Sequence, residues 1–195
     1  MRCARFIAAA SATLLAACAS APLPSEHFFR IETAPPAPRA PAVVVVAVER
    51  PQTHGVYNDR PLLYLGTDGS YQQYNYQNWV ESPGLMLRDG LADCLRGAYG
   101  SEHVTTSELH GRGMLVLQTE VQHLEQLVAR KSARLELDFT VVGADDKTLA
   151  TLSFDETEAA GSEAMGDYVQ AQDRLLARAC TGLLGQLDPL VRAPR

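Results

Sequence analysis

The side chains that most often do chemistry in proteins are scattered along this sequence. The five histidines are His27, His54, His103, His110 and His123. No H-E-x-x-H or C-x-x-C spacing accompanies them, and no carboxylates stand at the spacing of metal ligands. The G-x-S-x-G turn of serine hydrolases is missing as well. The sequence therefore predicts neither a metal site nor a serine hydrolase.

The acidic residues and one glycine-containing turn give no stronger sign of catalysis. Residues 143–148 (GADDKT) superficially resemble a phosphate-binding loop but lack its second glycine and its wider spacing. They separate two alternating segments, which favours a hairpin turn. Asp145 with Asp146, or Asp155 with Glu156, could be paired acids, but acids on turns and strand ends are usually only solvated. We expect no enzyme activity, no nucleotide hydrolysis and no cofactor.

A cysteine near the N-terminus carries the clearest chemical signal. Residues 1–17 contain two arginines and then an apolar run that is shorter than the roughly 20 residues needed to span a bilayer, which indicates an export signal. The run ends in Leu-Ala-Ala-Cys18, which resembles the lipobox of bacterial lipoproteins, whose cysteine is acylated, with palmitate for example, and becomes the new N-terminus. An ordinary signal peptide cleaved at an A-x-A site is the alternative. We predict lipidation at Cys18.

The residues after Cys18 predict where the protein resides. In enteric bacteria, an aspartate directly after the lipidated cysteine resembles an inner-membrane retention signal. Residue 19 is alanine instead, so we expect the protein at the periplasmic face of the outer membrane. Residues 18–26 form a tether that includes Pro22 and Pro24. At about 3.3 to 3.6 Å per residue it reaches on the order of 30 Å, so the folded part must stay close to its membrane.

Length and charge restrict the remaining chain. Removal of residues 1–17 from 195 leaves 178, which fits a single domain over residues 27–195. The loss of Arg2 and Arg5 changes the formal net charge from −6 to −8. An acidic chain without a basic block argues against binding to nucleic acid and against electrostatic binding to anionic lipid.

The first half of the domain has the pattern of short strands followed by a helix. Residues 27–32 and the valine run at residues 43–48 favour strands, the second buried on both faces, with a proline-rich connector between them. Residues 62–65 and 70–76 flank an Asp-Gly turn, which predicts a hairpin. Ser82 and Pro83 then begin a helix that Gly100 ends. Its apolar stripe is Leu87, Leu91, Cys94, Leu95 and Ala98.

The second half alternates with a period of two and then returns to a helical period. Residues 115–122, 133–141 and 150–154 predict antiparallel strands with one apolar face. A second helix is expected from Ser162 to about Leu187, with Pro189 just beyond its end. Together these elements predict an α+β fold, a two-layer sandwich of a mainly antiparallel sheet with both helices on one face.

Two further cysteines lie on the apolar faces of the expected helices. Acylation of Cys18 leaves Cys94 and Cys180, which would meet in the seam between the helices, in a compartment that permits disulfides. We predict a Cys94–Cys180 bridge; two buried free thiols are the alternative. Neither cysteine has the sequence context of a catalytic thiol.

Aromatic residues gather just before the first helix. Five of the seven tyrosines lie between Tyr57 and Tyr76, and the single tryptophan, Trp79, follows. A surface this aromatic requires a core or a partner. Tyr71 and Tyr74 project to opposite faces of a regular strand, so not all of these tyrosines can be buried, whereas Trp79 could simply close the core. The predicted partner-binding residues are Tyr71, Tyr74, Tyr76 and Trp79.

These features together resemble the ABC-type transport auxiliary lipoprotein family. The resemblance rests on the lipobox, an aromatic strand with Phe28 and Phe29, the valine run, and the tyrosines that end in Trp79 ahead of Pro83. It covers nearly the whole mature chain, although residue 78 is Asn where the family more often has a basic residue, and residues 53–69 match loosely.

The resemblance implies an outer-membrane lipoprotein that works with an MCE-type lipid transport system. Such a subunit would dock the periplasmic MCE protein at the outer membrane, without catalysis. Self-association as a homo-oligomer would match an MCE partner that is itself a ring, but nothing in the sequence shows it. The alternative function is an envelope lipoprotein that activates a periplasmic enzyme or assists secretion-pore assembly. An envelope hydrolase has the least support.

Overall fold

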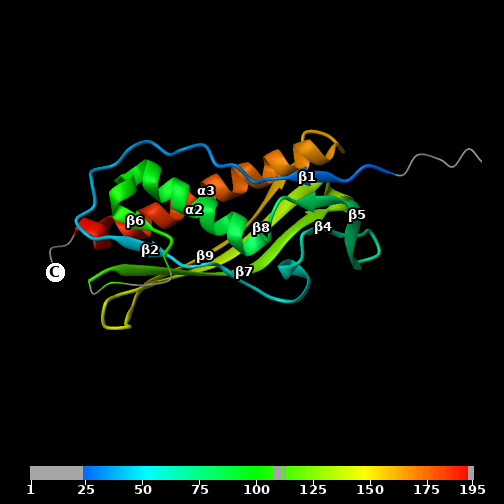
Figure 1. Ribbon diagram of the computed structural model, residues 1–195. Helices are drawn as coiled ribbons and strands as arrows, with labels where there is room; N and C mark the ends of the chain where they lie inside the picture. The colour runs from blue at the N-terminus through cyan, green and yellow to red at the C-terminus, as the bar shows by residue number, and fades with distance from the viewer. Residues whose placement is uncertain (1–23, 108–110, 112, 193–195) are drawn as a thin grey trace, which may run out of the picture.

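The computed structural model describes residues 24–107, 111 and 113–192 (Figure 1). The predicted export signal and the predicted lipidation site Cys18 lie outside the described residues. The strands are β1 (His27–Phe29), β2 (Val46–Val48), β3 (Gln52–Thr53), β4 (Pro61–Leu65), β5 (Tyr71–Trp79), β6 (Val104–Thr105), β7 (Leu115–Leu127), β8 (Ser132–Val142) and β9 (Thr148–Ala159). The helices are α2 (Pro83–Tyr99) and α3 (Met165–Arg192), with single 3₁₀ turns η2 (Gly55–Asn58), η3 (Ser101–His103) and η4 (Val128–Arg130).

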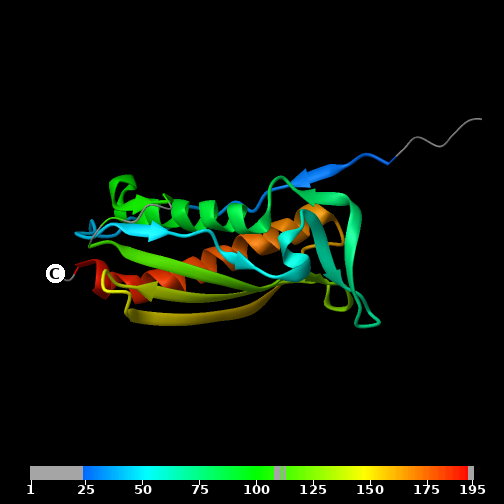
Figure 2. The same cartoon turned by 60° about the horizontal axis from the view of Figure 1, so that its bottom comes forward.

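All nine strands belong to one mixed sheet, which curls so that the β4–β5 hairpin turns away from the long strands (Figure 2). The long pairs β7–β8 and β8–β9 are antiparallel, as is β4–β5. However, β2, β3 and β4 all join β7 in parallel, β2 joins β6 in parallel, and β1 joins β5 in parallel. The prediction of a mainly antiparallel sheet was therefore wrong, and the curled sheet does not confirm a two-layer sandwich. Periodicity indicates which residues face the core, but it does not give strand direction, and here α2 provides the crossover that parallel pairing requires.

Both helices lie on one side of the long strands. α3 runs along β8 and β9, and α2 lies beside α3 over β2, β3 and β6 (Figure 1). The predicted bounds of α2 are confirmed: it follows Ser82 and ends at Gly100, whose φ of 97° suits glycine. The Ser82 hydroxyl does not cap the helix but accepts a 3.0 Å hydrogen bond from Arg50 Nη2.

α3 is longer than the sequence predicted. Pro189, expected just beyond the helix, lies inside its last turn. Proline has no N–H to donate to the carbonyl of Gly185, but this removes only one hydrogen bond, near the end of the helix. The preceding turns bury the apolar side of α3 and are unaffected.

The valine run forms a shorter strand than its composition suggested. Only Val46–Val48 is a strand, and all three of its residues are buried between β6 and β7. Val43 is 67% exposed, so the first part of the run is not part of the sheet. The predicted alternation of β7 and β8 is confirmed, with Leu115, Leu117, Leu135 and Leu137 in the core.

Two features join the N-terminal part and the helices. Pro35 and Pro36 of the connector cross α2 at Gly97, where an added Cβ would come within 3.1 Å of Pro36 Cδ. Cys94 of α2 and Cys180 of α3 form a disulfide across the helix seam, with Cα atoms 6.6 Å apart, a normal span for such a bond.

Candidate functional site

The β4–β5 hairpin holds the predicted partner-binding residues. Leu65 of β4 pairs with Leu127 of β7 on one side and with Tyr71 of β5 on the other. The register then shifts. Between the pairs Pro61–Asn78 and Leu63–Gln73, a step of two residues along β4 corresponds to a step of five residues along β5. The extra residues of β5 form a bulge, which bends the strand and changes the direction of its side chains.

Trp79 does not belong to an accessible surface. Its side chain is 1% exposed, and its ring centroid lies 6.5 Å from that of Tyr168 on α3. Trp79 pairs with Phe29 of β1 in the last part of β5, where α3 covers the sheet. The prediction that Trp79 contacts a partner was therefore wrong, because its indole closes the core.

Tyr74 is only partly accessible. Its hydroxyl donates a 2.6 Å hydrogen bond to Gln126 Oε1, and its ring lies 4.5 Å, centroid to centroid, from the ring of Tyr64. Burial raises the pKa of Tyr74. A partner could reach the edge of this ring but not its hydroxyl, which already has a partner.

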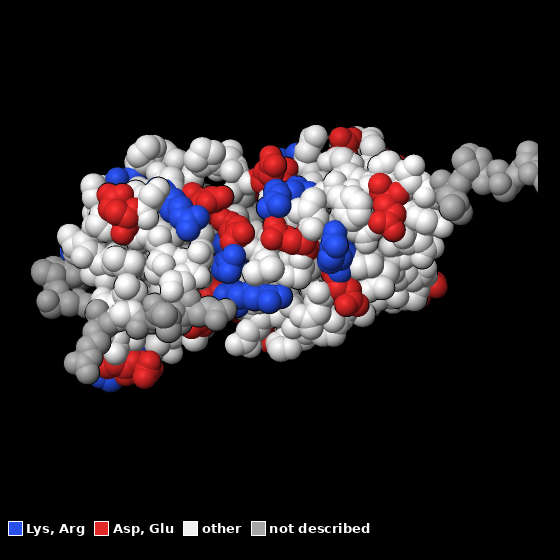
Figure 3. All heavy atoms as spheres, in the orientation of Figure 1, with Lys and Arg blue, Asp and Glu red and all other residues white. Residues whose placement is uncertain are grey.

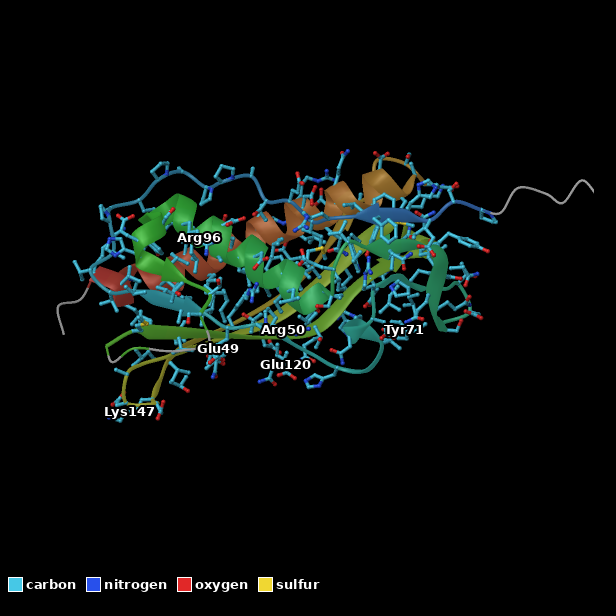
Figure 4. All side chains as sticks on the ribbon, in the orientation of Figure 1. Glu49, Arg50, Tyr71, Arg96, Glu120 and Lys147 are labelled. Atoms are coloured by element: carbon cyan, nitrogen blue, oxygen red, sulfur yellow. A yellow bond between two sulfur atoms is a disulfide. The ribbon has the colours of Figure 1, made fainter. Side chains whose placement is uncertain are left out.

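Tyr71 and Tyr76 are the two accessible tyrosines of the hairpin, with 47% and 43% of their surface exposed. Tyr71 lies at the hairpin end of the molecule, far from Lys147 at the other end of the long strands (Figure 4). Burial raises the pKa of Tyr71, and the nearby charge of Glu125 raises it further. Tyr71 is therefore half buried beside a carboxylate and half open to solvent.

That carboxylate is the centre of a cluster that sequence reasoning missed. Glu125 is 0% exposed and accepts a 2.5 Å hydrogen bond from the hydroxyl of Tyr57, which η2 carries. Its Oε1 lies 3.0 Å from His123 Nδ1 and 3.9 Å from Arg134 Nη1 but makes no hydrogen bond. Burial, followed by the hydrogen bond to Glu125, raises the pKa of Tyr57 well above its usual range.

The sequence contains one signal for this cluster. The apolar period of two breaks between Val121 and Leu124, which are three residues apart, and the structure has a register shift between Val121 and His123. The shift places Glu125 opposite Arg134 on the face away from the helices, where η2 covers it. A break in alternation thus marks the site, but it does not show what covers it.

Arg134 connects the cluster to the next strands. It donates from Nε and Nη2 to Asp155 of β9, over 2.9 and 3.1 Å, and from Nη2 to Glu136 over 2.6 Å. The hydrogen bond to Asp155 raises the pKa of Arg134, and the same bond lowers the pKa of Asp155. The guanidinium therefore ties β8 to β9 and lies next to Glu125.

A pocket opens between the hairpin turn and the ends of the long strands; Leu65, the β4 partner of Tyr71, lines it, and Tyr71 itself does not. We call this cavity the hairpin pocket; its volume is about 460 Å³, and Leu65, Gly66, Leu127, Arg130, Arg134 and Asp155 are among its lining residues. Its size is that of pockets that take small ligands or a partner's side chain. One wall is apolar and the other is charged.

Other kinds of site have no counterpart in the described ranges. Within residues 24–107, 111 and 113–192, no three His, Cys, Asp or Glu side chains come together as a metal site. No helix in this part of the chain is both long and apolar enough to cross a bilayer.

Comparison with solved structures shows the fold. A Xanthomonas campestris protein of the DUF330 family is 18% identical, with a TM-score of 0.66 over 83% of this chain and 94% of that one. An uncharacterized protein is 12% identical, with a TM-score of 0.71 over 84% of this chain and 99% of that one. No curated protein matches the sequence.

The sequence also matches a family model directly. The model of the ABC-type transport auxiliary lipoprotein component covers residues 30–183, from the end of β1 to the middle of α3. This range includes the hairpin, the Glu125 cluster and both cysteines of the disulfide. The chain therefore belongs to the family of ABC-type transport auxiliary lipoprotein components.

Proposed function

We propose that this lipoprotein is a non-catalytic subunit that docks the periplasmic MCE protein of an ABC-type lipid transport system at the outer membrane. The observation that carries the proposal is the half-exposed Tyr71, whose strand partner Leu65 lines the hairpin pocket. Family membership supports a role next to an ABC transporter. The hairpin supplies a surface, and the Tyr57, Arg134 and Asp155 side chains near it are engaged in hydrogen bonds and ion pairs within the protein.

Tyr71 has the properties of an interface anchor. A tyrosine offers a large contact area at a low entropic cost, and interface hot spots are enriched in this residue type. The Leu65–Tyr71 pair fixes its backbone, and Tyr57 and Glu125 flank its side chain. Because the side chain is already held in place, binding would cost little further conformational entropy, which favours affinity.

The position of the hairpin also fits this function. The chain leaves toward residue 23 from β1, which pairs with the far end of β5 (Figure 2). A short tether would hold the hairpin close to the membrane, so a partner that extends across the periplasm would meet it there.

Substitution of Tyr71 tests the proposal. The lipidated protein carrying Tyr71→Ser should capture the MCE protein about 10-fold less well, because a central aromatic anchor contributes on the order of 1 to 2 kcal/mol. Tyr71→Phe should retain most of the capture. Leu149→Ser is the matched control, since Leu149 is 39% exposed on β9, near Lys147 at the other end of the long strands. Equal capture by the folded Tyr71→Ser variant and by the control would refute docking at this site.

A further inference from the structure

A second exposed aromatic group lies on β1 and the far part of β5, apart from Tyr71. Phe28 is 50% exposed, Tyr76 is 43% exposed, and the guanidinium of Arg60 stands 5.3 Å from the centroid of the Phe28 ring. We call these three residues the exit patch. Large apolar side chains left in solvent usually mark a contact surface.

Three segments fix the exit patch. Phe28 of β1 pairs with Asn78 of β5, two residues after Tyr76, so the two exposed rings come from neighbouring parts of adjacent strands. Arg60 Nε donates a 3.1 Å hydrogen bond to the carbonyl of Trp79, so its side chain is held next to the same pair. The alternate residues, such as Trp79, point into the core. The exit patch is therefore a rigid, outward-facing surface.

The exit patch lies where the chain leaves the folded part. Residues 24–26 are exposed and lead away from the molecule at β1 (Figures 1 and 2). Phe28 is ten residues from Cys18 in the sequence. At about 3.3 to 3.6 Å per residue, this ring cannot be more than roughly 35 Å along the chain from the predicted lipid anchor.

Aromatic rings and arginine suit a bilayer surface. Such rings are favoured at the interface between headgroups and acyl chains, and arginine can keep its head in water while its stem lies on apolar surface. A single ring pair would bind a membrane weakly from solution. The tether makes the contact intramolecular, so even a weak attraction is sufficient to set orientation.

We infer that the exit patch rests on the surface of the membrane that anchors the protein. The lipid on Cys18 and the exit patch would then be two contacts with the same bilayer, which together fix the orientation of the domain. This inference rests on the lipid anchor and not on the docking at Tyr71. Because the chain is acidic, and basic side chains are interspersed with acidic ones on the face seen in Figure 3, the contact depends on the rings, so it should not weaken as salt increases.

Oxidative footprinting tests the inference without any substitution. The lipidated protein in phosphatidylcholine nanodiscs is compared with a secreted soluble form that begins at Ala19, and hydroxyl-radical modification of each aromatic side chain is measured. Phe28 and Tyr76 should react at least about 3-fold more slowly in nanodiscs, in both 50 and 500 mM salt. Tyr71, with a similar exposed fraction, should react equally in both forms and serves as the internal control.

Three results would overturn the inference: equal modification of Phe28 and Tyr76 in both forms, protection that disappears at 500 mM salt, or protection that arises only when the MCE protein is added. The last result would assign the exit patch to the partner. Because the nanodisc comparison contains no partner, its outcome is independent of the capture experiment with Tyr71→Ser.

Discussion

Beneath the two helices the molecule is held together by apolar contacts, whereas beneath the β4–β5 hairpin it is held together by polar ones. Leu91 of α2, Leu176 of α3 and Phe139 of β8 are at most 1% exposed and belong to the apolar core. Four of the buried polar residues, Glu125, Gln126, Ser132 and Gln172, lie near the hairpin end of the long strands, whereas Thr119 is buried in the middle of β7. Dispersive packing tolerates small shifts, while a buried polar network holds one geometry.

The difference suggests a division of roles. We call the region beneath α2 and α3 the helical half and the region beneath the β4–β5 hairpin the hairpin half. The helical half supplies most of the buried apolar area and hence most of the stability of the fold. Among the described residues, four of the five buried side-chain oxygens without a hydrogen bond lie in the hairpin half, namely Gln77 Oε1, Glu125 Oε1, Ser132 Oγ and Gln172 Oε1, and one, Thr119 Oγ1, lies in the helical half. Natural proteins retain such costs mainly where function requires them. The predictions below change one half at a time.

Removal of the buried carboxylate should have the largest effect. Glu125→Ala removes the buried carboxylate that accepts from the Tyr57 hydroxyl and lies beside His123 and Arg134, so the free energy of unfolding should fall by about 3 kcal/mol. Urea denaturation followed by circular dichroism measures this. Glu120→Ala is the control, since the Glu120 side chain is 45% exposed, and it should change stability by less than about 0.5 kcal/mol. Similar losses for both variants would show that the Glu125 cluster is not structural.

Removal of the disulfide should have the next largest effect. Cys94 and Cys180 are 86 residues apart, so their bond restricts a long loop of the unfolded chain. The double variant Cys94→Ser/Cys180→Ser should lose about 2 to 4 kcal/mol, and a reductant should destabilise only the wild-type protein. Capture of the MCE protein below the unfolding transition should remain unchanged, because the bond lies in the helical half. A reductant-insensitive wild type would contradict the bridge.

The helical half was also the half that the sequence predicted well. The apolar stripe from Leu87 to Ala98 and the alternation through β7 and β8 required only periodicity, which local sequence carries. The Cys94–Cys180 bridge was predicted from the apolar faces of the two helices. Strand direction did not follow, since the parallel pairing of β2, β3 and β4 with β7 depends on where α2 returns the chain.

The hairpin half was predicted only in outline. The Asp-Gly turn and the tyrosines located the hairpin, but burial of Trp79 and the contact between Tyr57 and Glu125 depend on residues brought from distant strands. Residues 53–69, which contain Tyr57, matched the family pattern only loosely. A site built from long-range polar contacts leaves little trace in local sequence, except for the broken alternation before Leu124.

Loss of one hydroxyl should loosen the hairpin more than the molecule as a whole. Tyr57→Phe deletes the donor to Glu125, which costs about 1.5 to 3 kcal/mol for a hydrogen bond to a charged group. Hydrogen exchange should accelerate in β4 and β5 and remain unchanged in α2 and α3. If exchange accelerates equally in all elements, the two halves are one cooperative unit.

The same hydroxyl gives the wild-type protein a sensitivity to alkali. The folded-state pKa of Tyr57 is raised above its unfolded value near 10. The contribution of its hydroxyl to the free energy of unfolding is therefore complete below about pH 10 and declines as the pH rises above that value. Part of the alkaline loss of stability should therefore be absent from Tyr57→Phe. Identical alkaline unfolding curves for the two proteins would contradict this assignment.

The smallest effect is expected at the link between β8 and β9. Arg134 holds the folded-state pKa of Asp155 below its unfolded value near 3.9. The stability that this ion pair contributes is therefore present above about pH 4 and is lost as the pH falls through the folded-state pKa. The Asp155 side chain is 48% exposed, so Asp155→Asn should cost less than about 1 kcal/mol at pH 7. The variant and the wild type should converge near pH 2. Asp146→Asn, at the exposed turn, should be neutral throughout, and a constant difference between Asp155→Asn and the wild type at all pH values would show that shape, not charge, links the strands.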